Sequence, residues 1–169
     1  DFSGLAENAY GWWKITNGQV DFSYVGYEQN GSNWWYVYGG QVCFQATDVL
    51  PGTVGGQYGW WKVCEGKVNF DDDVCENAYG WWKITTGKVD FHYTGLAQNA
   101  CGWWMIQNGH VNFGSNGLVD NGNGWWLVKN GCVDFTYNGL VDNGNGWWLI
   151  RNGYVDFNYN GLVDNGNGW

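Results

Sequence analysis

A repeated pair of tryptophans constrains the fold of this chain more than any other feature of its sequence. Seven Trp-Trp pairs occur, and four of the six steps between them are 22 residues long. The pairs begin at Trp12, Trp34, Trp60, Trp81, Trp103, Trp125 and Trp147. A fixed period of this length is typical of a solenoid, in which no repeat buries its apolar face alone and neighbouring repeats must stack.

The two ends of the chain follow the same period. One more step of 22 residues reaches Trp169, and Asp1-Phe2 matches the Asp-Phe that recurs in later repeats. We therefore expect residues 1–169 to form a single array of about seven hairpin units. Both ends are expected to fall inside a repeat, as in a window cut from a longer array.

Each repeat contains the pattern of a β-hairpin. In the segment WWMIQNGHVNF, residues 103–113, Asn108-Gly109 separates two short β-prone runs. Asn-Gly is a strong hairpin signal, because both residues of the turn need positive φ. A two-residue turn fixes the register, so Ile106 should face Val111. With 29 Gly, one Pro and 20% aromatic residues, the composition favours turns and strands, and we predict an all-β solenoid of stacked two-stranded hairpins.

One face of each hairpin is predicted to be apolar, since the same register pairs Trp104 with Phe113. The second Trp of each pair is expected in the core, at Trp13, Trp35, Trp61, Trp82, Trp104, Trp126 and Trp148. A Phe is expected to close the same face, at Phe22, Phe44, Phe70, Phe91, Phe113, Phe135 and Phe157. On the other face the register sets Lys14 opposite Asp21 and Lys83 opposite Asp90. Such charge pairs are expected to mark the side in contact with water.

The segment between hairpins, TYNGLVDNGNG in its most regular form, is rich in turn-forming residues. It is predicted to be a connector that swings the chain round to the next hairpin. Its one aliphatic residue is expected to act as a plug, at Leu96, Leu118, Leu140 and Leu162.

The first Trp of each pair is not explained by the hairpin core, because strand alternation points it to the opposite face. These rings either pack against the adjacent hairpin or line ligand grooves between hairpins. Aromatic faces suit the C–H face of a sugar ring or a quaternary ammonium group. The candidate ligand-binding residues are Trp12, Trp34, Trp60, Trp81, Trp103, Trp125, Trp147, Tyr24, Tyr93, Tyr137 and Tyr159.

Tandem units of the form GWW-x-[IV]-x-NG-x-V, each followed by a Gly-rich connector, resemble the cell-wall-binding repeats of Gram-positive bacteria. That group includes choline-binding and glucan-binding repeats, and the receptor-binding repeats of clostridial toxins are similar. The resemblance implies a β-solenoid, an extracellular location that is either secreted or on the cell surface, and ligand sites between successive units. The nearest positions to those sites are the first-Trp series and the Tyr that follows Asp-Phe.

The charge balance excludes several partners. The net charge is −9 with seven Lys and Arg, so no basic surface for nucleic acid or anionic lipid is expected. No apolar run is long enough for a membrane span, so we expect no membrane insertion.

Metal, disulfide and catalytic signals are weak. Asp71–Asp73 and the DNGNG segments at 120–124, 142–146 and 164–168 carry oxygen ligands suited to calcium, but they match no calcium-loop pattern, and Asn-Gly turns explain the latter. We therefore expect no metal and no cofactor.

Of the five cysteines, Cys64 and Cys75 are the likeliest internal pair by spacing. His92 and His110 occupy variable repeat positions, so no catalytic residues and no enzymatic activity are expected.

Two functions remain open from the sequence. The first is a multivalent module that binds a cell-wall polymer or glycan, with avidity from several equivalent sites. The second is a structural stalk or filament in which repeat arrays associate end to end. Solvent access to the first-Trp series distinguishes the two.

Overall fold

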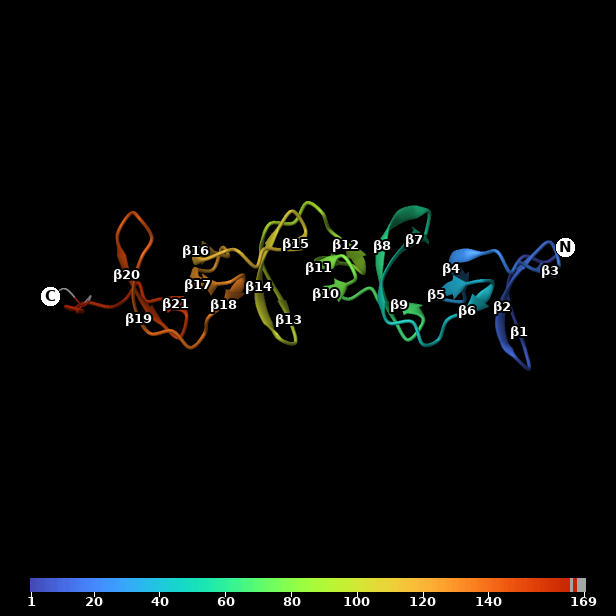
Figure 1. Ribbon diagram of the computed structural model, residues 1–169, viewed down its shortest axis with the longest axis horizontal. Helices are drawn as coiled ribbons and strands as arrows, with labels where there is room; N and C mark the ends of the chain where they lie inside the picture. Colours follow the sequence, from blue (N-terminus) through green and yellow to red (C-terminus); the bar gives the residue numbers. More distant parts are fainter. Residues whose placement is uncertain (165, 167–169) are drawn as a thin grey trace. The chain divides into compact units, whose positions relative to one another are not determined.

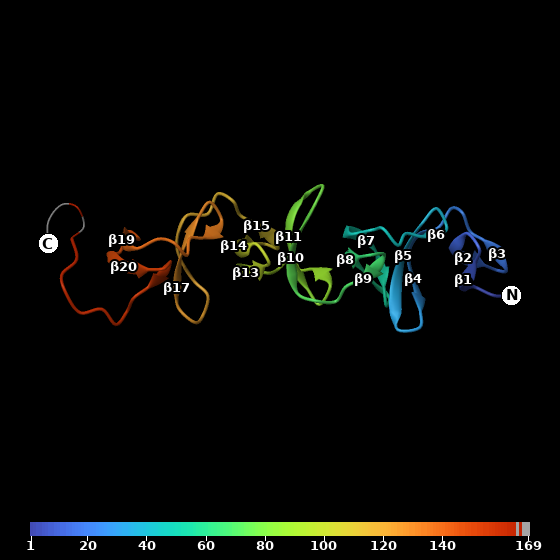
Figure 2. The same ribbon diagram turned by 90° about the horizontal axis from the view of Figure 1, so that it is seen from below.

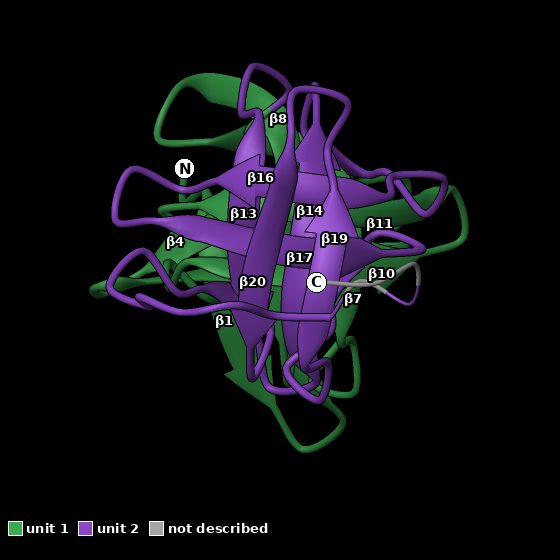
Figure 3. Cartoon of the chain, turned by 90° about the vertical axis from the view of Figure 1, so that its left-hand side faces the viewer, with its two compact units in different colours: residues 1–90 green, residues 91–169 purple. Residues whose placement is uncertain are grey.

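The computed structural model describes residues 1–164 and 166. Trp169, where the eighth repeat was expected to begin its Trp pair, lies outside these residues, and the third DNGNG segment, 164–168, lies partly outside them. The described chain contains 21 short strands and no helix, so the predicted all-β fold of stacked hairpins is confirmed. The described residues therefore include no helix long and apolar enough to cross a membrane. Two compact units are present, residues 1–90 and residues 91–169 (Figure 3).

Each repeat contributes three strands. The leading strands are β1 (Gly4–Asn8), β4 (Val25–Asn30), β7 (Asp48–Val54), β10 (Asp73–Asn77), β13 (Gly95–Asn99), β16 (Gly117–Asp120) and β19 (Gly139–Asp142). The Trp strands are β2 (Gly11–Thr16), β5 (Asn33–Tyr38), β8 (Gln57–Cys64), β11 (Gly80–Thr85), β14 (Gly102–Gln107), β17 (Trp125–Lys129) and β20 (Trp147–Arg151). The short strands are β3 (Gln19–Val20), β6 (Gln41–Val42), β9 (Lys67–Val68), β12 (Lys88–Val89), β15 (His110–Val111), β18 (Cys132–Val133) and β21 (Tyr154–Val155).

The predicted turn and register are confirmed. Ile106 pairs with Val111, and the two side chains are 0% and 1% exposed. Asn108 has φ of 52° and Gly109 has φ of 78°, as a turn of two left-handed residues requires. The buried aliphatic residues of the Trp strands and short strands therefore form the core, one pair to each repeat from the second repeat to the seventh.

The predicted connector is wrong in one respect, because half of it is a strand. Gly117–Asp120 pairs antiparallel with the Trp strand along its whole length, with Leu118 opposite Leu127. The true turn of this hairpin is the segment 121–124, which joins β16 to β17. The leading strand escaped notice because Gly, Asn and Asp lower its β-propensity, and pairing with the Trp strand compensates for this. Leu96 is buried as a plug should be, whereas Leu162 is 74% exposed.

Successive hairpins are joined through the backbone of the turn glycine. In the N-terminal unit, Gly40 O accepts a hydrogen bond from Lys14 N at 2.7 Å, and Gly40 N donates to Tyr24 O at 3.0 Å. In the C-terminal unit, Gly131 O accepts from Met105 N of the preceding repeat at 2.7 Å, and Gly131 N donates to Ser115 O, just before its own leading strand, at 2.9 Å. Figures 1 and 2 show the result within the N-terminal unit, where β1–β2 and β4–β5 are seen alternately broadside and end-on. Within this unit, the second hairpin is thus rotated relative to the first.

The predicted place of the phenylalanines is wrong. They are all 43% or more exposed rather than part of the core. Phe113 does meet Trp104, but the rings touch edge to face with centroids 5.9 Å apart. The reason is that the short strand ends at the preceding Val, so the Phe lies in the turn that follows and covers only the rim of the tryptophan.

The predicted solvent exposure of the face that carries Lys14 and Lys83 is also wrong, although the backbone register is confirmed. Asp21 N donates to Lys14 O at 2.9 Å, yet the Lys14 ammonium pairs with Glu28 at 2.7 Å. Lys83 is buried to 7% exposure and pairs with Asp72 at 3.3 Å. The next repeat covers this face, so it is not the wet side of the hairpin.

All five cysteines are free thiols in the structure, and no disulfide joins Cys64 to Cys75. Cys64 lies opposite Lys67 within one repeat, and Cys75 lies opposite Trp82 in the next hairpin. Burial, together with the nearby Asp73 carboxylate, raises the pKa of the Cys75 thiol to about 12. This thiol therefore stays protonated near neutral pH.

The aspartate that follows each short strand shapes the next turn. Asp134 accepts hydrogen bonds from the Thr136 hydroxyl at 2.7 Å and from Thr136 N at 3.0 Å, and its other oxygen pairs with Lys129 at 2.9 Å. These contacts, led by the Thr136 hydroxyl, hold the pKa of Asp134 at about 2. The carboxylate is thus a turn-forming group, as Asx turns require.

We expect Thr136→Ala to raise the pKa of Asp134 from about 2 towards the ordinary 3.8. Because the folded pKa lies below the unfolded value, the contribution of Asp134 to stability is complete above pH 3.8 and is lost as pH falls through 2. A carboxyl-carbon NMR titration of wild type and variant measures the shift. Asp21 is the internal control, since Ser23 lowers its pKa and that contact is intact in the variant. An unchanged Asp134 midpoint would contradict this account.

Candidate aromatic cage

A cavity of about 70 Å³ in the C-terminal unit brings together residues of two successive repeats. It is lined by Leu96, Trp103, Asn121, Trp126, Val133 and Phe135, which we call the Trp cage. A single water needs only about 10–15 Å³ of such volume, so the cage admits a compact group of several heavy atoms.

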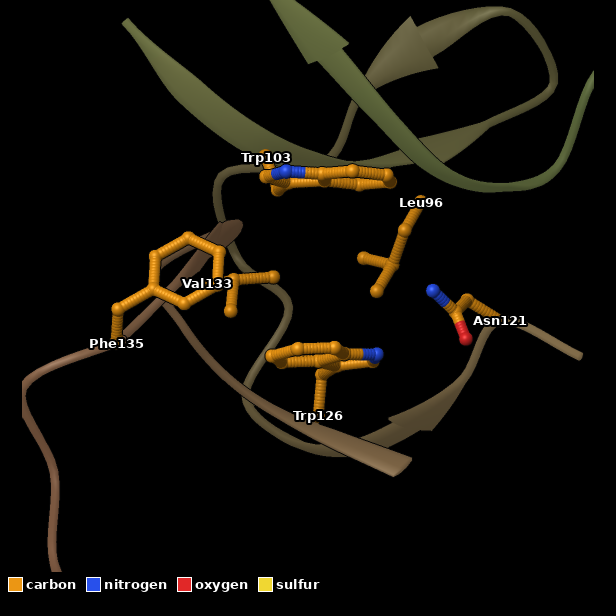
Figure 4. Close-up of a pocket in the computed structure, with 6 residues that line it drawn as sticks. All are labelled: Leu96, Trp103, Asn121, Trp126, Val133 and Phe135. Atoms are coloured by element: carbon orange, nitrogen blue, oxygen red, sulfur yellow. The ribbon is translucent and has the colours of Figure 1, made fainter. Parts of the chain in front are cut away.

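Three neutral rings form the walls of the Trp cage. The indoles of Trp103 and Trp126 lie across the cavity with their faces turned towards each other, and Phe135 closes one side (Figure 4). Phe135 meets Trp126 edge to face, with centroids 5.6 Å apart. Leu96 and Val133 line the rest with aliphatic groups, and Asn121 supplies the one polar side chain of the lining.

The elements of the fold set these positions. Trp103 lies on β14 and points away from the core of its own hairpin, as strand alternation predicts. Trp126 on β17 and Val133 on β18 belong to the next repeat, and Phe135 lies in the turn after β18. The cage therefore exists only because one repeat stacks on the next.

The structure places the first-Trp series in two environments. Trp125 is 37% exposed and Trp147 is 53% exposed. The others are half-buried, at Trp12, Trp34, Trp60, Trp81 and Trp103. Rings of this series are therefore partly packed and partly accessible to solvent.

Two equivalent positions in the N-terminal unit are occupied by the chain's own rings. Tyr27 stands where the cage has Leu96; it is 4% exposed, packs in the cluster that contacts Trp34, and donates its hydroxyl to Leu50 O at 2.9 Å. Burial raises the pKa of this hydroxyl. Trp60 instead meets Tyr79 edge to face at 5.4 Å.

The tyrosines of the predicted site have structural contacts. The hydroxyls of Tyr24, Tyr93 and Tyr137 each donate to the backbone carbonyl three residues later, at 2.7 to 2.9 Å. Tyr159 makes the same bond at 3.2 Å. The rings of three of them also carry a cation of the chain itself, Lys14 on Tyr24, Lys129 on Tyr137 and Arg151 on Tyr159.

Sequence reasoning missed Trp126, Phe135, Leu96, Asn121 and Val133 as cage residues. Trp126 and Phe135 were expected in the core, because the hairpin register alone groups them there. The signal that separates them is the turn-forming Thr136-Tyr137 directly after Asp134-Phe135, which ends the strand before the Phe.

The indole nitrogens of the second-Trp series differ between repeats. Trp13, Trp82 and Trp104 donate to the side-chain oxygen of the Asn five residues earlier, at 2.9 to 3.0 Å. Among the described residues, Trp126 and Trp148 have no hydrogen-bond partner for this buried N–H. Their repeats carry Asn-Gly-Asn-Gly at the hairpin turn instead of Asn-Ala-Tyr-Gly or Asn-Ala-Cys-Gly.

A metal or a catalytic group is not indicated at the Trp cage. Over residues 1–164 and 166, no three His, Cys, Asp or Glu side chains are arranged to hold a metal ion. At 120–124 the polar side chains instead form the turn, since Asp120 accepts from Gly122 N at 2.8 Å and Asn121 accepts from Asn123 N at 3.0 Å.

Three solved structures are similar to this chain. CbpJ of Streptococcus pneumoniae shares 16% identity with a TM-score of 0.41, covering 99% of this chain and 57% of that one. Choline binding protein F of the same organism shares 17% identity with a TM-score of 0.39, covering 99% and 56%. A pneumococcal cell-wall endolysin from phage Cp-1, complexed with choline, shares 18% identity with a TM-score of 0.28, covering 92% and 37%. The chain thus spans less than two thirds of each of these proteins.

No curated protein sequence matches the chain. The model of the choline-binding repeat matches five segments, which together make up more than half of the chain: residues 1–21, 23–43, 93–112, 114–134 and 136–156. Two of these segments, 93–112 and 114–134, contain residues of the Trp cage. The chain belongs to the choline-binding repeat family.

Proposed function

We propose that this chain is a non-catalytic, multivalent binding module, secreted or on the cell surface, that holds a cell-wall polymer in aromatic cages between successive hairpins. The observation that carries the proposal is the Trp cage. Its ligand would be a quaternary ammonium substituent of the polymer, the group that the name of the family suggests.

The chemistry of the cage favours a cation without acidic hydrogens. A ring face attracts a nearby cation through its quadrupole, with about 0.5–2 kcal/mol per contact depending on desolvation. Trp103 and Trp126 offer two such faces, and Phe135 offers a third ring. Methyl groups on the ammonium bury against these walls, so no hydrogen-bond acceptor is needed to hold the charge. The net charge of −9 adds a long-range attraction for cationic substituents.

Repetition would turn weak single sites into firm attachment. Each later contact between one array and one polymer is intramolecular, so avidity exceeds the affinity of any single cage. Trp125 and Trp147, which are exposed, are the next candidates for cage walls in the C-terminal unit.

We expect choline to bind the 169-residue protein at the Trp cage. Titration with choline chloride, followed by NMR of the indole N–H groups, should shift the Trp103 and Trp126 resonances in a saturable way. Phe135→Leu keeps an apolar wall but removes a ring, and should weaken binding by about ten-fold, the equivalent of one strong cation–π contact.

Phe22→Leu is the matched control, because Phe22 makes the same edge-to-face contact with its own Trp in the first repeat. It should leave the Trp103 and Trp126 titration unchanged. If neither resonance responds to choline, or if both variants lose binding equally, the cage proposal is wrong. Concentration-dependent assembly in light scattering, without any choline response, would favour the structural array instead.

A further inference from the structure

A second groove, in the N-terminal unit, has a different chemistry from the Trp cage. It is open, has a volume of about 510 Å³, and is lined by Trp35, Phe44, Gln45, Glu65 and Lys67. Phe44 is 43% exposed and meets Trp35 edge to face with centroids 5.3 Å apart. The groove therefore combines an exposed aromatic platform with three polar side chains.

The backbone fixes the polar side chains around this platform. Glu65 occupies the left-handed first position of a two-residue turn, with φ of 49°, and its N–H is held by the Thr47 hydroxyl at 3.1 Å. Lys67 follows on β9, directly opposite Trp35 in the ladder between repeats. Gln45 comes immediately after Phe44 in the chain.

The polar heads in the groove are available to a ligand. Within the described part of the chain, the Gln45 amide and the Glu65 carboxylate have no hydrogen-bond or ion-pair partner. The Lys67 ammonium contacts the Trp35 ring, with its nitrogen 5.3 Å from the centroid. Together these groups offer two kinds of acceptor and two kinds of donor beside an apolar surface.

The charges of the groove exclude the ligand proposed for the Trp cage. Lys67 already lies over the Trp35 ring, so an external ammonium would meet a like charge at that face. An anionic ligand would meet Glu65 and the net charge of −9. A neutral ligand with many hydroxyls avoids both penalties. It can lay its C–H face on Phe44 and use its hydroxyls to bond Gln45, Glu65 and Lys67.

We propose that the groove of Trp35, Phe44, Gln45, Glu65 and Lys67 binds a neutral oligosaccharide. This site is separate from the Trp cage and does not depend on it. The sequence indicates that this site occurs in one repeat alone, because no other repeat has opposite charges at the two positions that flank the turn glycine, here Glu65 and Lys67. Four of the other repeats have Asn where Glu65 stands, and the repeat before has Gln where Lys67 stands.

These differences supply a test that preserves the fold. In the double variant Glu65→Asn with Lys67→Gln, both positions carry residues that other repeats use at the same backbone geometry. Calorimetric titration of the full chain with chitotetraose, cellotetraose and maltotetraose should find binding by at least one of them. The double variant should bind that saccharide about ten-fold more weakly, through loss of charged hydrogen-bond partners.

Phe44→Leu should also weaken saccharide binding, whereas Phe22→Leu, the equivalent change in the first repeat, should leave it unchanged. Choline titration of the double variant should match that of wild type, since the Trp cage is untouched. The proposal is overturned if none of the three saccharides binds, or if the double variant binds them as wild type does. Saccharide-induced NMR shifts at Trp103 rather than Trp35 would overturn it as well. A failure of choline binding alone would leave this result unaffected.

Discussion

Gly40→Ala should lower the free energy of unfolding far more than Gly18→Ala, although both glycines hold the second position of the same kind of turn. Their φ values are 79° and 82°, so an alanine pays the same left-handed strain at each. A Cβ at Gly40 would lie 2.5 Å from Asp21 O and 3.0 Å from the Phe22 Cα, both backbone atoms of the preceding repeat. A Cβ at Gly18 would meet nothing within 4 Å.

We expect a loss of about 3 kcal/mol for Gly40→Ala, from strain and overpacking together, and about 1 kcal/mol for Gly18→Ala from strain alone. Urea denaturation gives both values from the midpoint and slope of unfolding. The contact with the preceding repeat also links this result to the stack, because the Gly40 carbonyl accepts a hydrogen bond from Lys14 N of that repeat. Equal losses in the two variants would show that the turn conformation alone accounts for the glycine.

Asn99→Ala should destabilise the protein more than Asn121→Ala. The Asn99 side-chain oxygen accepts from Cys101 N at 2.9 Å, from Gly102 N at 3.2 Å and from the Trp104 indole at 2.9 Å. Its removal leaves partly buried donors unpaired, and we expect a loss of about 2–3 kcal/mol.

Asn121 occupies the equivalent place in the next repeat but accepts from Asn123 N, while the Trp126 indole has no described partner. We expect Asn121→Ala to cost about 1 kcal/mol. Urea denaturation monitored by far-UV circular dichroism measures both variants without ligand. If Asn121→Ala costs as much as Asn99→Ala, the Trp126 indole has a partner through that side chain and our account of the turn is wrong.

The local part of this fold was predictable from the sequence because the two-residue turn determines it. Asn108-Gly109 sets the register, and Ile106 and Val111 are then forced into one face. The leading strand was not predictable in the same way. Gly117–Asp120 has little β-propensity of its own, and it becomes a strand because the Trp strand offers its free edge.

The candidate site was predictable only in its aromatic character. Trp103 was identified because alternation turns it away from its own hairpin, but its partners Trp126 and Phe135 lie in the following repeat. Which face of a ring is open depends on how the repeats stack, and no spacing within one repeat carries that information. Tyr27 illustrates the limit, since a ring at the position of Leu96 packs into the core beside Trp34.

The third repeat indicates where such an array tolerates changes in length. Its step of 26 residues instead of 22 is absorbed at the end of the β7–β8 hairpin, which has seven paired positions where β1–β2 has five. Insertions of two pairs leave every side chain on its original face, whereas an odd residue would exchange the faces beyond it. The hairpin ends are therefore the places where residues can be added to the repeat without disturbing its packing. In-frame additions that keep this parity can diversify them, and they are the natural points for grafting foreign peptides.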